Sequence, residues 1–147
     1  MEELDVKDKI LKGAEELFMR YGIRSISMDD IARHLTVSKK TLYQHFADKD
    51  DLVLSVSRSH LQRNKAEFEG IWESAKNPIE ELAQISACMR TNMETMNPTL
   101  LFDLQKFHPK AWGEWIVFKN KYIRENVIRN LSKGIADGYI RADINPE

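Results

Sequence analysis

The chain has 147 residues, of which 42% are hydrophobic and 31% charged, and its formal net charge is −1. This length fits one compact domain or two small lobes that share a helix, and the low content of 6 Gly and 4 Pro excludes disordered and low-complexity classes. The single cysteine, Cys88, excludes an internal disulfide, and the scattered histidines lack zinc-ligand spacing. Because the first residues are acidic and no apolar run reaches about 18 residues, we expect a cytoplasmic protein without a membrane span.

Two helices are predicted before the first tight turn. Apolar residues at helical spacing indicate a first helix from about residue 6 to residue 21, and Gly22 stands where a glycine commonly ends a helix. Ser27 precedes a second, short helix over about residues 28–35. Its first turn carries Asp29 and Asp30, whose charges favour the positive end of the helix dipole.

A third helix follows the second after a short turn. Residues 36–37 break the second helix, Ser38 can cap the next, and Leu42 and Phe46, four residues apart, supply its buried face. Asp48 then caps a longer fourth helix, whose apolar stripe continues to about residue 75.

The second half of the chain predicts three further helices. Asn77 and Pro78 have the form of an N-cap followed by a proline at the first helical position, so a fifth helix begins there and closes at residues 97–98. A sixth covers about residues 99–107, and a seventh runs from about residue 111 to residue 131. The expected inner face of the fifth helix comprises Ile79, Leu82, Ser86, Met89, Met93 and Met96. The predicted fold class is all-α.

The second and third helices have the layout of a helix-turn-helix, whose second helix enters the major groove of DNA. At about 100° per residue, Lys40 and Gln44 point away from the buried direction of this helix. The side chains that point outward or lie on its flanks are Lys40, Thr41, Tyr43, Gln44 and His45. Residues 33–47 contain no acidic residue, although neither half of the chain is basic as a whole.

Several motifs with fixed spacings occur in the N-terminal part of the chain. They are Ala14–Phe18, Tyr21–Gly22, Asp29–Ala32, Val37–Phe46 and Lys49–Leu52. Together they resemble the DNA-binding domain of the TetR family of bacterial transcription regulators over about residues 8–56, and beyond that the helix layout is similar, with a further likeness in Gly138–Asp143. The resemblance implies a homodimer whose N-terminal domain, residues 1–50, binds half-sites of a double-stranded DNA operator, and whose residues 51–147 form a helical regulatory domain.

The resemblance also implies which side chains meet DNA. It places Lys39, Lys40 and Thr41 at base edges or neighbouring phosphates. It assigns the phosphate backbone to Ser27, Tyr43, His45 and Lys49, and Ser38 and Gln44 complete the candidate set. Thr36 departs from the family, which commonly has glycine in this turn, and a positive φ there would cost a β-branched residue about 1 kcal/mol.

Methionine and aromatic side chains of the fifth to seventh helices predict an apolar core that can repack around a ligand. The resemblance implies that an apolar small-molecule effector binds there and releases the DNA. The candidate pocket residues are Met89, Met93, Phe102, Phe107, Trp112, Trp115 and Tyr122. No enzyme motif, cofactor or metal site is expected, because the sequence has no nucleophile–base motif, glycine-rich phosphate loop or H-E-x-x-H spacing. We interpret the chain as a ligand-responsive repressor, and the alternative is a helical protein-interaction module that does not bind DNA.

The last three residues, Asn145, Pro146 and Glu147, repeat the pattern of Asn77 and Pro78 and so predict the start of another helix. Members of the resembled family continue with two more helices, which form a four-helix bundle with those of a second subunit. We therefore expect a shortened chain whose ligand-binding and dimerisation domain lacks its last two helices.

Overall fold

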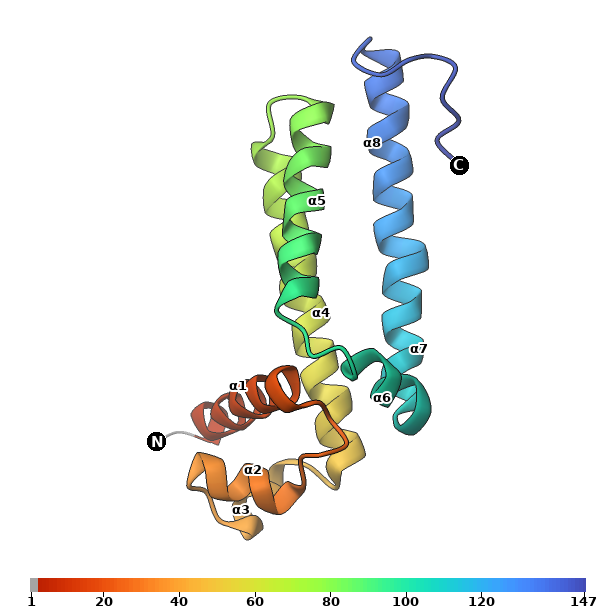
Figure 1. Ribbon diagram of the computed structural model, residues 1–147. Coiled ribbons are helices and arrows are strands. Elements are labelled where there is room, and N and C mark those ends of the chain that lie inside the picture. The colour runs from red at the N-terminus through yellow and green to blue at the C-terminus, as the bar shows by residue number, and fades with distance from the viewer. Residues whose placement is uncertain (1–2) are drawn as a thin grey trace. The chain divides into compact units, whose positions relative to one another are not determined.

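The computed structural model describes residues 3–147, and every regular element within them is a helix (Figure 1). The elements are α1 (Glu3–Tyr21), α2 (Met28–Leu35), α3 (Lys39–His45), α4 (Lys49–Ser74), α5 (Pro78–Glu94), α6 (Leu100–Phe107), α7 (Pro109–Val117), the π-helical segment η1 (Phe118–Ile123) and α8 (Arg124–Ala136). The predicted all-α class is confirmed.

The chain divides into two compact units, and neither is continuous in sequence. The first unit comprises Met1–His60 and Thr95–Glu114, and the second comprises Leu61–Glu94 and Trp115–Glu147. The functional boundary at residue 50 that the resemblance implies stays a prediction. The apolar stripe of α6 predicts that this helix is buried, but it does not indicate which helices bury it.

The core of the first unit lies where α1, α2, α3 and α4 meet. Its largest fully buried side chains are Phe18, Phe46, Ile10, Ile31, Leu42, Leu52 and Val53. From α6 and α7, Leu100, Leu104 and Ala111 join the same core. Because burial of a large apolar side chain stabilises by about 1.5–3 kcal/mol, this core holds α2 and α3 firmly against α1 and α4.

Side chains predicted to begin α4 and α5 do so. The Oδ1 of Asp48 accepts a hydrogen bond from the backbone N–H of Asp51 at 2.8 Å, and the Oδ1 of Asn77 accepts one from that of Glu80 at 2.9 Å. Each side chain satisfies a backbone donor that has no partner inside its helix.

Aromatic rings pack together in the second unit, where the C-terminal half of α4 faces η1. Ring centroids lie 6.5 Å apart for Phe68 and Phe118, 5.1 Å for Phe118 and Tyr122, and 5.7 Å for Trp72 and Tyr122. In the same unit, the Nδ2 of Asn130 on α8 donates to the first carbonyl of α5 at 3.1 Å. These contacts tie α4, α5 and α8 into one bundle.

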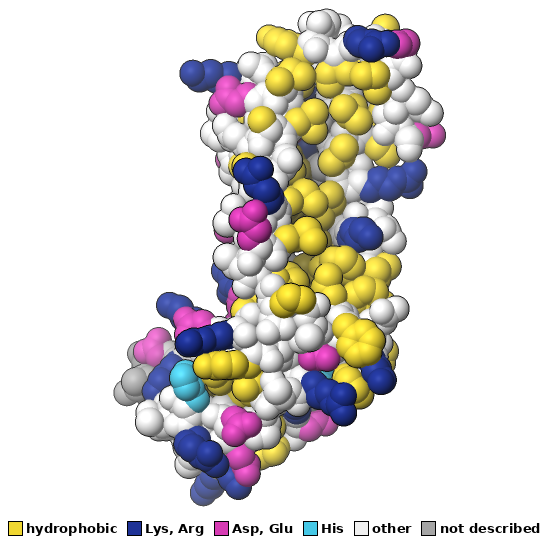
Figure 2. Space-filling model, viewed as in Figure 1, with side chains coloured by type: hydrophobic (Ala, Val, Ile, Leu, Met, Phe, Trp, Pro, Cys, Tyr) yellow, Lys and Arg dark blue, Asp and Glu magenta, His cyan; other side chains and the backbone are white. Residues whose placement is uncertain are grey.

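The predicted inner face of the fifth helix is wrong at four of its six positions, whereas Leu82 and Met96 are half-buried. Ile79, Met89 and Met93 are exposed by 47%, 36% and 69%, whereas Ile85 is buried. The side of α5 that faces α4 is partly polar, since the Sγ of Cys88 bonds to Glu67 and the Nδ2 of Asn92 bonds to Asn64. A stripe drawn through apolar residues alone therefore lies one position away from the true inner face. Hydrophobic side chains accordingly show at the surface along α5 and α8 (Figure 2).

The predicted seventh helix is also different in detail. It begins at Pro109 rather than near residue 111, and it continues as α7, η1 and α8 to Ala136. A π-helical turn inserts into the usual α-helical pattern, and apolar spacing does not signal it. Its six residues carry Phe118 and Tyr122, which stack in the aromatic cluster.

Candidate nucleic-acid interface

The turn between α2 and α3 is built by a Schellman motif. The backbone N–H of Thr36 bonds to the carbonyl of Arg33 at 3.3 Å, and that of Val37 bonds to the carbonyl of Ala32 at 3.0 Å. Thr36 has φ 54° and ψ 40°, the left-handed conformation that this motif requires at the position usually taken by glycine. The motif ends α2 and turns the chain directly into Ser38, which begins α3.

The short helix α3 presents one face to solvent and one to the core. Leu42 and Phe46 are fully buried, while Lys40, Gln44 and Tyr43 are exposed, Tyr43 by 48%. Thr41 and His45 are half-buried at the sides. This arrangement matches the orientation expected from helical spacing, and it leaves an ammonium, an amide and a phenol available on a helix slim enough for the major groove.

The N-termini of α2 and α3 are capped by serines. The Oγ of Ser27 accepts from the backbone N–H of Asp30 at 3.0 Å, and the Oδ2 of Asp30 accepts from the backbone N–H of Ser27 at 2.9 Å, which is a capping box. Hydrogen bonds from the backbone and then the side chain of Ser27 lower the pKa of Asp30. The Oγ of Ser38 accepts from the backbone N–H of Thr41 at 3.0 Å. Both serines are exposed at helix N-termini, which favour phosphate.

Two candidate lysines already have partners within the protein. The Nζ of Lys39 lies 3.0 Å from the Oδ2 of Asp29, and both side chains are more than half exposed, so the pair is weak and open to exchange. The Nζ of Lys49 donates to the backbone carbonyl of Ile23 at 2.7 Å. Burial lowers the pKa of Lys49, and the charges of Asp103 and Asp30 oppose that effect. The assignment of Lys49 to phosphate stays a prediction.

Sequence reasoning missed Asp103 of α6. Its side chain is 5% exposed, and its Oδ2 accepts from the backbone N–H groups of Ile23 at 3.1 Å and Arg24 at 3.0 Å. The available signal was an acidic residue at core spacing between Leu100 and Leu104, inside an otherwise apolar stripe.

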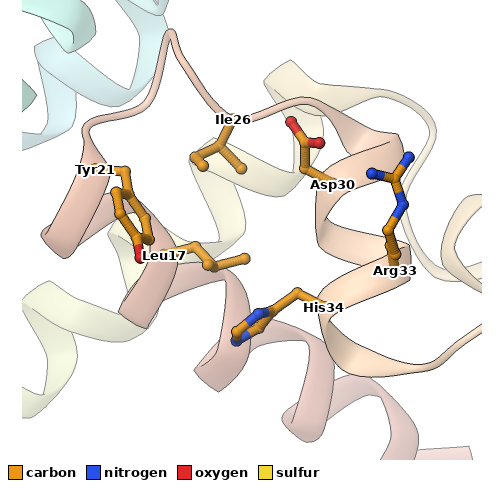
Figure 3. A pocket seen from close by; sticks show the side chains of 6 residues that line it. All are labelled: Leu17, Tyr21, Ile26, Asp30, Arg33 and His34. Atoms are coloured by element: carbon orange, nitrogen blue, oxygen red, sulfur yellow. The ribbon is translucent and has the colours of Figure 1, made fainter.

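A hollow of about 400 Å³ lies between α1 and α2 (Figure 3). Its lining residues are Leu17, Tyr21, Ile26, Asp30, Arg33 and His34. Asp30 is held by Ser27, and Tyr21 is half exposed with the Arg20 guanidinium 5.2 Å from its ring centroid. None of these six residues belongs to the candidate effector pocket.

The candidate effector-pocket residues are distributed over both units. Phe102, Phe107 and Trp112 belong to the first unit, where Phe102 is 57% exposed and Phe107 is 40% exposed. The members in the second unit are Met89, Met93, Trp115 and Tyr122. Within that unit, burial raises the pKa of Tyr122 to about 12, with the Glu69 charge acting in the same direction. The pocket itself stays a prediction.

A membrane-spanning helix and a cluster of metal ligands are both absent from the described part of the chain. Residues 3–147 include no helix that combines the length and the apolar character needed to cross a membrane. Within the same range, no three His, Cys, Asp or Glu side chains are grouped as metal ligands would be.

Comparison with known proteins agrees with the helix-turn-helix geometry. A profile of the family described as bacterial regulatory proteins, tetR family, matches residues 10–56. The HTH-type transcriptional regulator YvaF of Bacillus subtilis is 31% identical over 136 residues, which is 84% of this chain and 71% of YvaF. The HTH-type transcriptional repressor KstR2 of Mycobacterium tuberculosis is 26% identical over 142 residues, which is 95% of this chain and 71% of KstR2.

Solved structures extend the likeness to most of the described fold. The structure of the ketosteroid transcriptional regulator KstR2 gives a TM-score of 0.72 at 25% identity, over 95% of this chain and 73% of that one. A TetR-family regulator from Agrobacterium tumefaciens gives 0.77 at 22% identity, over 93% and 75% of the two chains, which shows the common fold.

Proposed function

The chain belongs to the TetR family of bacterial regulatory proteins and is a DNA-binding transcription regulator, and from this premise we propose that it represses transcription as a dimer under the control of an apolar effector. Family members bind operator DNA and act as dimers. The relative KstR2 is named a transcriptional repressor, and this name favours repression over activation for the present chain. The expected place of action is the cytoplasm, where bacterial DNA lies.

The observation that carries the proposal is the exposed face of α3. Lys40, Tyr43 and Gln44 project from a helix whose other face is locked into the core by Leu42 and Phe46. A lysine reads guanine and a glutamine reads adenine at the major-groove edge, whereas a tyrosine hydroxyl suits a phosphate. We assign sequence preference to Lys40 and Gln44, and register on the backbone to Tyr43.

This assignment is tested by selecting preferred duplexes from a random DNA pool and measuring affinity against salt. Lys40→Ala should change the preferred half-site, with a loss of about 1–3 kcal/mol on the wild-type site. Tyr43→Phe should weaken all sequences about equally. Lys76→Ala, an exposed lysine in the turn before α5, is the matched control and should change neither.

The result that contradicts the assignment is a Lys40→Ala variant with unchanged sequence preference, which would make Lys40 a phosphate contact. A wild-type protein that binds no duplex even at low salt would favour the protein-interaction module instead.

The effector proposal rests on the second unit and on the name of one relative. KstR2 is called a ketosteroid regulator, and ketosteroids are apolar molecules with carbonyl acceptors. The Nε1 of Trp72 is buried and has no hydrogen-bond partner among the described residues, so a carbonyl group would satisfy it. A ketosteroid is accordingly the first probe to titrate into the protein–operator complex.

The expected result is release of the DNA, with about fivefold weaker response in Trp72→Phe, because one hydrogen bond of about 1 kcal/mol is lost. The variant should bind the operator as the wild type does. If the ketosteroid leaves the wild-type complex intact at saturation, this class of effector is rejected.

A further inference from the structure

The turn between α1 and α2 is held by the segment that begins α6. The backbone N–H of Asn97 donates to the carbonyl of Met19 at 3.0 Å, and its Nδ2 donates to the carbonyl of Arg20 at 3.0 Å. These are carbonyls of the last turn of α1, which have no partner inside the helix. The end of α1 is thus capped by a residue more than seventy positions later in the chain.

Gly22 brings this turn close to α6. Its φ is +83°, and a Cβ at this position would lie 2.6 Å from the Oγ1 of Thr99 and 3.4 Å from the Oδ2 of Asp103. Only a glycine allows both the left-handed backbone and this approach. The backbone N–H groups that follow it therefore reach the carboxylate of Asp103.

Asp103 and Lys49 bond to the two backbone polar groups of the same residue, Ile23. The Oδ2 of Asp103 accepts the N–H of Ile23, and the Nζ of Lys49 donates to the carbonyl of Ile23. Asp103 is 5% exposed, and a buried carboxylate is stable only when hydrogen bonds and an opposite charge compensate it. The two backbone N–H groups supply the hydrogen bonds, and the nearby ammonium of Lys49 supplies the charge.

The turn lies directly before the DNA-binding elements. Ser27, which begins α2, follows Arg24 by three residues, and Lys49 is the first residue of α4. The place of the turn therefore decides where α2 starts and where the ammonium at the start of α4 is held. Asp103 is buried, so it reaches neither bases nor phosphates itself.

We propose that Asp103 is a positioning residue for DNA binding, which acts by holding the Ile23–Arg24 turn and, through Ile23, the ammonium of Lys49. The proposal rests on the DNA-binding role of α2 to α4 and goes beyond it by assigning a functional residue to α6. A carboxylate with no such role should oppose DNA binding, because it repels the phosphates. Removing the carboxylate should therefore weaken DNA binding if Asp103 positions the turn, and strengthen it if Asp103 acts only through its charge.

The test measures affinity for the selected operator, and its salt dependence, in Asp103→Ala and Asp103→Asn. Asp103→Ala removes the acceptor and should weaken binding on the order of tenfold on all sequences. Asp103→Asn keeps an acceptor oxygen but loses the charge, and should weaken binding about threefold. Glu114→Gln is the matched control, since this variant also removes one negative charge from the first unit. Glu114 pairs with Arg58 and does not bond to the Ile23–Arg24 turn. This variant should bind as tightly as the wild type or slightly more tightly.

Lys49→Met completes the test as a double-mutant cycle. If Asp103 acts through the turn and Lys49, the double variant with Asp103→Ala should bind no more than about twofold more weakly than the weaker single variant. Asp103→Ala should also reduce the slope of log affinity against log salt concentration by about one unit. Loss of one phosphate contact has this effect, and here the lost contact would be that of Lys49, because Asp103 itself carries no positive charge. Hydrogen exchange of the Ile23 and Arg24 amides should become faster in the same variant.

The proposal is overturned if Asp103→Asn, with an unchanged circular dichroism spectrum, binds as tightly as Glu114→Gln. Additive losses in the double-mutant cycle would overturn it as well. If Asp103→Ala does not fold, the operator affinity of Asp103→Asn still decides the question. A wild-type protein that binds no DNA would contradict the assignment of α3 instead, so the two failures are distinguishable.

Discussion

Thr36 should lower the stability of the first unit through its backbone conformation. It occupies the left-handed position of the Schellman motif that ends α2, with φ 54°. An L-residue in this conformation costs roughly 1–2 kcal/mol, and the cost is greatest for a β-branched side chain. The side chain is exposed, and among the described residues its Oγ1 bonds to the carbonyl of the preceding residue, Leu35, so its contacts do little to offset this cost.

Thr36→Gly should therefore raise the free energy of unfolding by about 1 kcal/mol. Relief of the strained backbone contributes roughly 1–2 kcal/mol, and the greater entropy of glycine in the unfolded chain removes about 0.5–1 kcal/mol of it. The melting temperature should rise by about 3 °C for a chain of this size. Since the hydrogen bonds of the motif are made by the backbone, DNA affinity should not change.

The assay is urea denaturation followed by circular dichroism, with Lys76→Gly as the control. Lys76 is also exposed and lies in a turn, but it is not in the left-handed region, so glycine there should lower stability by about 0.5–1 kcal/mol. If Thr36→Gly destabilises the protein as much as Lys76→Gly does, the left-handed backbone carries no strain and the reasoning is refuted.

Three further predictions concern the same structure. The Ser27 hydrogen bonds lower the pKa of Asp30 below its usual 3.8, so they contribute fully to the free energy of unfolding above about pH 5, and this contribution is lost as the pH falls through the folded pKa. In an acid titration of stability, Asp30→Asn should lack this part of the decrease. With the pKa of Tyr122 raised to about 12, its phenol should ionise well above the usual pH of about 10 in a spectrophotometric titration, and Tyr122→Phe should remove that step; ionisation near pH 10 would contradict the burial. Leu104→Ala in α6 should lower the free energy of unfolding by about 2–4 kcal/mol, because Leu104 lies in the core of the first unit; a change below about 0.5 kcal/mol would show that α6 is not part of that core.

Features that depend on near neighbours along the chain were predictable from the sequence. Ser27, Ser38, Asp48 and Asn77 begin helices as expected, because a cap bonds to a backbone N–H only three residues away. The exposure of Lys40, Tyr43 and Gln44 on α3 follows from helical geometry once Leu42 and Phe46 are recognised as buried. The cost attached to a positive φ at Thr36 was foreseeable for the same reason.

Features that depend on distant partners were decided only by the tertiary structure. The bonds of Asp103 to Ile23 and Arg24 join residues about eighty positions apart, and the bond of Lys49 to Ile23 spans 26 positions, so no local spacing announces them. The prediction for the inner face of α5 was wrong at four of six positions because an apolar stripe ignores polar side chains, and Cys88 and Asn92 lie on the side of α5 that contacts α4. Helical periodicity states that a face is buried, whereas the partner that buries it is chosen by packing across the whole chain.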